Sequence, residues 1–190
     1  MDGRSPSLRF ALITYQLIDR RYPMTHSLSL LGAIHTTLSL IPVAAGFYGF
    51  ARHRAIEPAT RSGRIYLAGL AVSVFTAFGL SSTGGFNPGH AVGILALLAA
   101  IGSLLVPRMS FVGRLRPYLA TFGISFSFFL LLVPAIAETL TRLPSAHPLA
   151  DGPQSVVVRT TLLAWIATFI VGFVLQAWMI RSRRRGMVRE

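Results

Sequence analysis

Three side chains that can bind a metal ion or move a proton stand in or beside apolar stretches of this chain. His35 lies within one stretch, His90 opens another, and Glu138 is the one acidic residue inside an apolar stretch. Two imidazoles and a carboxylate suit a divalent metal ion, and two imidazoles from different helices can hold the iron of haem b. These residues therefore raise two cofactor hypotheses: a metal site at His35, His90 and Glu138, or a haem site at His35 and His90.

Each histidine also has an interpretation without a cofactor. The polar residues Thr36, Thr37 and Ser39 follow His35, so a neutral His35 that bonds to a neighbouring helix accounts for its position equally well. His90 follows Asn87-Pro88-Gly89, which is typical of a turn that leads into a helix, and a boundary histidine at that place meets lipid headgroups. His35 is expected to lie about two helical turns deeper than His90, which is an awkward offset for a shared ligand.

Glu138 has a candidate partner in Arg159. A lone carboxylate near hydrocarbon is costly, and Arg159 begins the next apolar stretch at the same expected depth. An ion pair between Glu138 and Arg159 is therefore the expectation if no metal is bound.

The elements that must position these residues are transmembrane helices. Four windows carry no Arg, Asp or Glu, namely 22–51, 65–107, 117–137 and 160–180. A bilayer core requires about 20 apolar residues per helix, and the second window is broken by the Gly-rich turn 84–89. We expect an all-α, polytopic transmembrane helix bundle in one domain, residues 28–180. Its five spans are placed at about 28–50, 65–82, 90–106, 118–139 and 157–180, and four spans is the alternative.

The two ends of the chain differ from this domain. In the segment 1–27, apolar residues between Leu8 and Tyr15 follow helical spacing, with Arg9, Gln16 and Arg20 on the other face. This pattern predicts a short interfacial helix on the membrane surface, although a tail with a chance pattern also fits. Residues 181–190 are expected to form a basic cytoplasmic tail.

The formal net charge is +12, and all 18 basic residues are arginine. They fall between the apolar windows, which is the placement that membrane topology requires, so we expect no nucleic-acid partner. With the N-terminus outside, twelve arginines lie inside and six outside. The charge rule therefore predicts a multi-pass protein with the N-terminus outside and the C-terminus in the cytoplasm. The absence of lysine is typical of a GC-rich bacterial genome, so we expect the membrane to be a bacterial inner (cytoplasmic) membrane.

Part of this basic charge is clustered near the predicted inner face. Such clusters bind anionic lipid headgroups or an acidic partner, or they act as topology anchors without a specific ligand. The clustered residues are Arg52, Arg54, Arg61, Arg64, Arg181, Arg183, Arg184 and Arg185.

Three features between His35 and Ala99 carry a resemblance to a known family. They are His35 itself, the element Gly63-Arg64-Ile65-Tyr66, and His90 after a Gly-rich turn. This third of the chain resembles an uncharacterised family of predicted bacterial membrane proteins with a domain of unknown function. In that family a His-Arg pair precedes the Gly-Arg-x-Tyr element, whereas this chain has Ala59-Thr60. The resemblance implies a small helical membrane protein with histidines near the outer side, and no known reaction.

Function is the least determined property. There is no cysteine, which excludes thiolate chemistry, and no catalytic motif of the hydrolase, metalloprotease, P-loop or kinase type is present. Small residues four apart (Gly69 and Ser73, Ala96 and Ala100, Ala99 and Ser103) predict close helix packing. Four phenylalanines are expected to face lipid: Phe122, Phe126, Phe128 and Phe129. We expect a non-enzymatic accessory component that packs with other membrane subunits or with itself. A haem- or metal-binding membrane redox protein is the alternative, and a transporter is a weaker third.

Overall fold

The computed structural model describes residues 30–80, 85–144 and 146–186, and within these ranges the regular structure is entirely helical. Five long helices follow one another, with two short 3-10 helices before the fourth. They are α2 (Leu30–His53), α3 (Arg61–Phe78), α4 (Pro88–Leu105), η1 (Val106–Arg108), η2 (Ser110–Leu115), α5 (Arg116–Arg142) and α6 (Val156–Gly186). The interfacial helix predicted at residues 8–20 lies outside the described residues.

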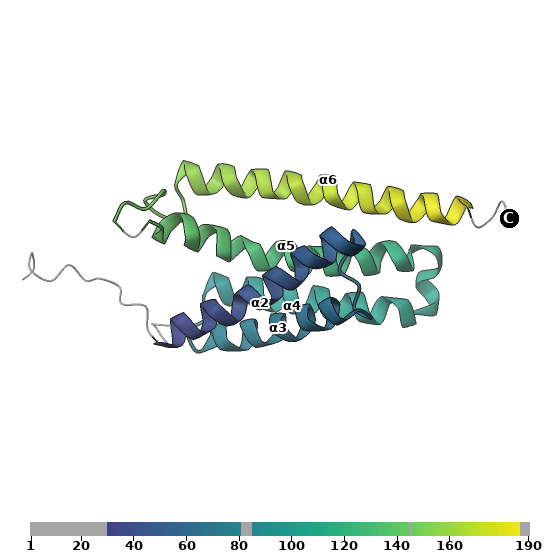
Figure 1. The fold of residues 1–190 in the computed structure, drawn as a ribbon, viewed down its shortest axis with the longest axis horizontal. Coiled ribbons are helices and arrows are strands. Elements are labelled where there is room, and N and C mark those ends of the chain that lie inside the picture. The colour runs from purple at the N-terminus through teal and green to yellow at the C-terminus, as the bar shows by residue number, and fades with distance from the viewer. Residues whose placement is uncertain (1–29, 81–84, 145, 187–190) are drawn as a thin grey trace, which may run out of the picture.

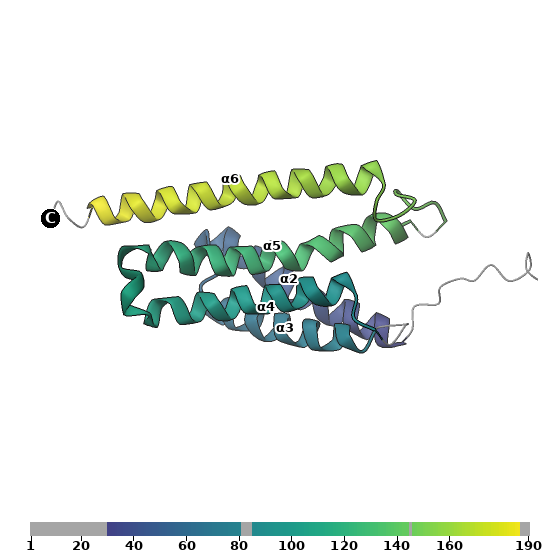
Figure 2. The same cartoon turned by 180° about the vertical axis from the view of Figure 1, so that it is seen from behind.

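The five helices run alternately up and down along one axis (Figures 1 and 2). The α2–α3 loop, the η1–η2 connection and the C-terminal end of α6 lie at the same end, which we call the basic end. Among the described residues, these segments and the helix ends beside them carry eleven arginines, whereas the opposite end carries Arg142 and Arg159. The eleven are Arg52, Arg54, Arg61, Arg64, Arg108, Arg114, Arg116, Arg181, Arg183, Arg184 and Arg185.

In the part of the chain that the structure describes, four stretches of helix are long and apolar enough to cross a membrane: Leu30–His53, Pro88–Arg108, Ser110–Arg142 and Val156–Arg185. The prediction of an all-helical fold with membrane-type helices is thereby confirmed. Helix α3 is not among the four. It has 18 residues, and Arg61 and Arg64 stand in its first turn. The fifth crossing therefore stays a prediction.

The helix boundaries differ from the predicted spans where a cap sets them. The second span was placed at 65–82, but α3 begins at Arg61 because the Thr60 hydroxyl accepts a hydrogen bond from the Gly63 amide at 3.0 Å. Helix α4 begins at Pro88, two residues before the predicted start, because Asn87 caps it. Helix α6 continues to Gly186, so the first six residues of the predicted tail are helical.

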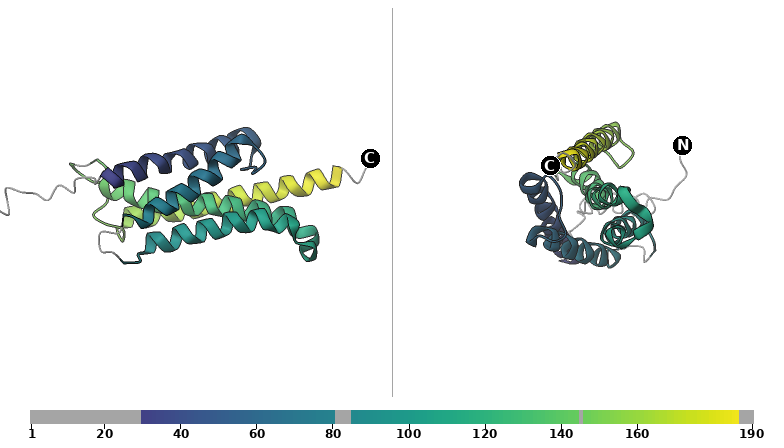
Figure 3. Two further views of the ribbon diagram at one scale, coloured as in Figure 1. Left: turned by 90° about the horizontal axis from the view of Figure 1, so that it is seen from below. Right: turned by 90° about the vertical axis from the view of Figure 1, so that its right-hand side faces the viewer.

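The core lies between two helical hairpins, α2–α3 and α4–α5, and α6 packs on α5 (Figure 3). Phe128 stands at its centre and is 2% exposed. Its ring lies 5.2 Å from those of Phe47 and Phe50 and 6.1 Å from that of Tyr66. The prediction that Phe128 faces lipid is therefore wrong. The predicted lipid-facing rings of Phe122, Phe126 and Phe129 are likewise half-buried, because they stack between α5 and α6.

Small residues close the contacts between neighbouring helices. A Cβ added at Gly69 would lie 2.8 Å from Pro42 on α2. A Cβ at Gly123 would lie 2.8 Å from the Ala99 carbonyl and 3.0 Å from the Ser103 Cβ on α4. These distances are shorter than van der Waals contact, so Gly69 and the pair Ala99 and Ser103 lie at close approaches between helices, as their spacing predicts.

Candidate functional site

His35 joins α2 to α3 through a chain of hydrogen bonds. Its Nδ1 lies 2.8 Å from the Thr76 hydroxyl, and its Nε2 lies 3.4 Å from the Ser39 hydroxyl. Because the Thr76 hydroxyl donates to the Val72 carbonyl at 2.9 Å, it accepts from His35, which places the imidazole proton on Nδ1. Ser73 donates to Ser39 at 2.9 Å, and this leaves the Ser39 proton for Nε2.

His90 joins α4 to the same end of α3. Its Nε2 donates to the Ala77 carbonyl at 3.1 Å, and its Nδ1 accepts from the Asn87 amide at 3.3 Å. The Asn87 side chain accepts from the His90 amide in return, which completes a reciprocal cap. The His90 ring is buried and stacks on Phe78 at 4.6 Å.

The two histidines therefore clamp the C-terminal end of α3 from two sides. One bonds to Thr76 and the other to Ala77, so the rings lie at different helix interfaces. All four ring nitrogens contact protein groups, and binding a metal through His90 Nδ1 would break the cap of α4. In the described part of the chain, no three His, Asp or Glu side chains lie close enough to share a metal ion. This arrangement does not fit a haem or metal site shared by His35, His90 and Glu138.

Glu138 forms an ion pair with Arg142, one helical turn further along α5, and both side chains are more than half exposed. The ion pair predicted with Arg159 on α6 is not the one that the structure forms. A residue four positions along the same helix is within reach without any tertiary contact, so the local partner is favoured. An exposed pair of this kind contributes at most about 0.5 kcal/mol.

A polar contact that sequence reasoning missed lies at the basic end. Gln176 of α6 is 6% exposed. Its side-chain amide donates to the Arg54 carbonyl at 3.0 Å, and its carbonyl accepts from the Ser125 hydroxyl at 2.9 Å. One buried amide therefore connects α6 to both α5 and the end of α2. The signal was visible in the sequence, because Gln176 is the one amide side chain in the window 160–180.

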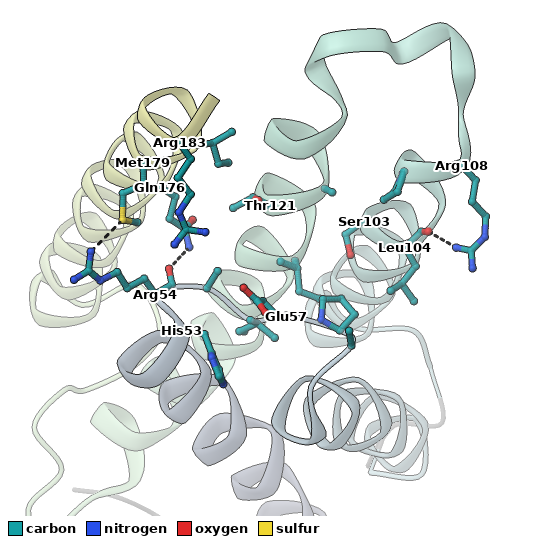
Figure 4. Close-up of a pocket in the computed structure, with 18 residues that line it drawn as sticks. His53, Arg54, Glu57, Ser103, Leu104, Arg108, Thr121, Gln176, Met179 and Arg183 are labelled. Carbon is teal, nitrogen blue, oxygen red and sulfur yellow. Dashed lines mark hydrogen bonds between the residues drawn. The ribbon is translucent and has the colours of Figure 1, made fainter. Parts of the chain in front are cut away.

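A cleft with a volume of about 650 Å³ opens beside Gln176 (Figure 4). Its walls are the α2–α3 loop, the end of α4, the start of α5 and the last turns of α6. Of the arginines that were expected to bind lipid or a partner, Arg54 and Arg183 line it. The other six, Arg52, Arg61, Arg64, Arg181, Arg184 and Arg185, lie elsewhere at the basic end.

The element Gly63-Arg64-Ile65-Tyr66 has a structural role. A Cβ at Gly63 would lie 1.9 Å from the Glu57 carbonyl oxygen, so only glycine fits there. Tyr66 is fully buried, and its hydroxyl lies 2.6 Å from that of Ser127 on α5. This element thus fixes the start of α3 against the loop before it and against α5.

Over the described residues the fold defines a class: an all-helical protein that has, within those ranges, four helices long and apolar enough to cross a membrane. No protein-family model matches the chain, and no curated protein or solved structure matches it either. The resemblance to an uncharacterised family of membrane proteins stays a prediction, and function has to be argued from the residues themselves.

Proposed function

We propose that this chain is a non-enzymatic accessory component of a membrane assembly, and that α6 is the helix that packs against the partner subunit. The observation that carries the proposal is one exposed flank of α6, on which small side chains stand four residues apart. These residues are Thr160, Ala164, Thr168 and Gly172, and all four are exposed. Small residues at this spacing let two helices approach closely within a membrane.

Helix α6 is attached to the rest of the bundle along one face. It has 31 residues, yet 6% of its most apolar window is buried, against 17%, 22% and 28% for the other three membrane-type stretches. Its contact with α5 is a seam of rings, which comprises Phe122, Phe126, Phe129, Trp165, Phe169 and Phe173. The Trp165 indole also donates to the Phe129 carbonyl at 3.1 Å. The other faces of α6 are left for lipid or another protein.

The glycine of the small-residue flank of α6 is open, as is Gly102 on α4, whereas other glycines in the bundle face a neighbouring helix. A Cβ added at Gly69 would contact Pro42, one at Gly93 would contact Val74, and one at Gly123 would contact Ser103. A Cβ added at Gly172 would meet nothing within 4 Å. Elsewhere in this fold a neighbouring helix packs against such small residues. The flank of α6 has no such neighbour within the chain, which supports a helix from a second protein as its partner.

The remaining exposed flank of α6 has a different character. It carries large aliphatic residues, namely Leu163, Ile166, Ile170 and Val174. Such side chains match the acyl chains of lipid, which need no close backbone approach. The two flanks thus supply an internal comparison: a test flank on which small residues recur every four positions, with Val171 and Leu175 beside them, and a control flank on which the residues four apart are large.

We propose further that all five helices cross the membrane, with the N-terminus outside and the C-terminus in the cytoplasm of a bacterium. Helix α2 ends and α3 begins at the basic end, whereas α4 begins at the opposite end. If α2 and α4 cross, α3 has to cross between them. Its 18 residues span about 27 Å, close to a hydrocarbon thickness of about 30 Å. Arg61 and Arg64 reach the headgroups at its start. The concentration of arginine at the basic end supports a cytoplasmic location of that end.

The test is a comparison of two leucine substitutions in the native membrane. Gly172→Leu fills the open flank, and Ile170→Leu changes the control flank without a change in size. After extraction in a mild detergent, native electrophoresis reports the mass of the complex that contains the chain. We expect the wild type and Ile170→Leu to migrate in a larger assembly and Gly172→Leu to migrate at the mass of one chain. A wild type that migrates as a single chain, or an unchanged assembly in Gly172→Leu, contradicts the proposal.

A further inference from the structure

The cleft at the basic end combines both signs of charge with an apolar wall. Its 650 Å³ falls within the range of about 300–1,000 Å³ that is usual for sites of small ligands. Arg54, Arg183 and Glu57 line it, and Arg108 lies on its far side, where it donates to the Leu104 carbonyl at 2.6 Å. Figure 4 shows the Arg183 side chain beside Gln176 and the Glu57 side chain in the space between the helices.

The opposite charges in this cleft do not neutralise each other. Within the described residues the one ion pair is that of Glu138 with Arg142, at the other end of the molecule. The Glu57 carboxylate forms neither a hydrogen bond nor an ion pair there, and the Arg54 guanidinium has only a weak contact with the Met179 sulfur at 3.8 Å. The Glu57 carboxylate and the Arg183 guanidinium lie in one cleft without pairing, and the Arg54 side chain points toward Met179 at its edge (Figure 4), an arrangement complementary to a ligand that carries both charges.

The backbone of Arg54 adopts a conformation that is unfavourable for a residue other than glycine. Its φ angle is 61°, in the left-handed region where glycine is the usual residue after a helix. A side chain other than glycine costs about 1 kcal/mol in this conformation. The buried amide of Gln176 bonds to the Arg54 carbonyl and stabilises it. The chain thus keeps an arginine, with its charge at the rim of the cleft, at a position where glycine would be more stable.

The rest of the wall is mixed: His53, Ser103, Thr121 and Gln176 are polar, and the larger part is apolar. The apolar part includes Leu104, Pro107, Ala120, Ile124, Met179 and Ile180. An apolar surface below a charged rim suits a molecule with a charged head and a hydrocarbon body. If the helices cross a bilayer as proposed above, the cleft lies at the depth of the lipid headgroups.

We propose that this cleft binds a zwitterionic phospholipid whose headgroup carries a phosphate and a primary ammonium, as in phosphatidylethanolamine. Arg183 and Arg54 contact the phosphate, because guanidinium donors match phosphate oxygens. Glu57 accepts from the ammonium, and the apolar wall receives the start of the acyl chains. Phosphatidylglycerol presents the phosphate without the ammonium. Phosphatidylcholine presents a quaternary ammonium that has no N–H to donate.

The experiment measures lipid binding to the whole, detergent-purified chain by native mass spectrometry. Phosphatidylethanolamine, phosphatidylglycerol and phosphatidylcholine of equal chain length are compared, and soluble phosphoethanolamine is the competitor. We expect tightest binding of phosphatidylethanolamine. Glu57→Gln should weaken that lipid roughly fivefold and leave phosphatidylglycerol unweakened, which removes the preference. Arg183→Gln should weaken both lipids roughly fivefold, since the phosphate is common to them.

Two further variants keep the test independent of folding. Arg185→Gln removes one charge from the same end of α6 outside the cleft and should bind all three lipids as the wild type does. Arg54→Gly keeps the left-handed backbone, so it should weaken binding without loss of thermal stability. Equal binding of the three lipids, or an equal loss in Arg185→Gln and Arg183→Gln, overturns the proposal. So does a loss of phosphatidylglycerol in Glu57→Gln as large as that of phosphatidylethanolamine. Competition by soluble phosphoethanolamine at the affinity of the lipid would instead assign the cleft to a soluble ligand. None of these variants touches the exposed flank of α6, so the two proposals fail separately.

Discussion

Replacement of Gln176 by leucine tests how the last helix is held. The substitution conserves size and removes two interhelical hydrogen bonds, one to the Arg54 carbonyl and one from the Ser125 hydroxyl. Interhelical hydrogen bonds in membrane proteins contribute about 0.6 kcal/mol on average, with a maximum of about 1.7 kcal/mol. Ser125 is buried, but its hydroxyl can turn to the carbonyl one turn earlier in α5, as Thr139 and Thr141 do in the same helix. The two losses together should therefore destabilise the fold by about 1–2 kcal/mol.

The assay is reversible unfolding in detergent micelles, followed by circular dichroism. Ser125→Ala removes one of the two bonds and should cost about 0.6 kcal/mol. In the double variant the Ser125 loss should disappear, because its partner is already absent. Val174→Leu is the matched control, since it is an exposed apolar change on the same helix and should alter stability by less than about 0.5 kcal/mol. A Gln176→Leu protein as stable as the wild type would refute the view that this amide fastens α6 to α2 and α5.

Three further substitutions test other contacts by the same unfolding assay. Ser127 donates to the Ile124 carbonyl, so Tyr66 is the donor in its 2.6 Å contact with Ser127. Tyr66→Phe should therefore lower the free energy of unfolding by about 1 kcal/mol. No loss would mean that this contact is not a stabilising hydrogen bond. Gly63→Ala should cost about 2–3 kcal/mol, since the new Cβ would overlap the Glu57 carbonyl; a neutral result would contradict the tight loop. Trp165→Phe keeps the stacked ring and loses the indole bond, so a cost of about 0.6 kcal/mol is expected, and a cost above about 3 kcal/mol would show that packing dominates.

The helices were predictable because charge is excluded from hydrocarbon. The windows free of Arg, Asp and Glu correspond to α2, α4, α5 and α6, and the Gly-rich turn separates α3 from α4 as expected. The ends were less accurate, because caps such as Thr60 and Asn87 decide where a helix begins, and hydropathy does not register them. The lipid-facing prediction for Phe128 is wrong for a related reason: phenylalanine is as favourable in a packed core as in lipid, so composition alone cannot separate the two.

The candidate site was harder to predict than the fold. His35 bonds to a neighbouring helix, as its cofactor-free interpretation predicts, whereas His90, which was predicted to meet lipid headgroups, is buried and bonds to α3. Residue type and spacing along the chain could not show that both histidines meet the same helix. For Glu138 the sequence did contain the answer, since Arg142 follows four residues later on the same helix. The cleft at the basic end combines residues from four separate segments, and only their packing brings Glu57 and Arg183 to one space.

The central claim is that the small-residue flank of α6 contacts another protein in the membrane. Site-specific photo-crosslinking in intact native membranes tests it directly, with a compact aliphatic diazirine amino acid, which adds little bulk to the flank, placed at Thr168 or, as the control, at Ile170. Both positions are exposed on α6 but lie on different flanks. The account predicts a discrete protein adduct from position 168 and lipid adducts alone from position 170. Lipid adducts alone from both positions, or the same protein adduct from both, would contradict it.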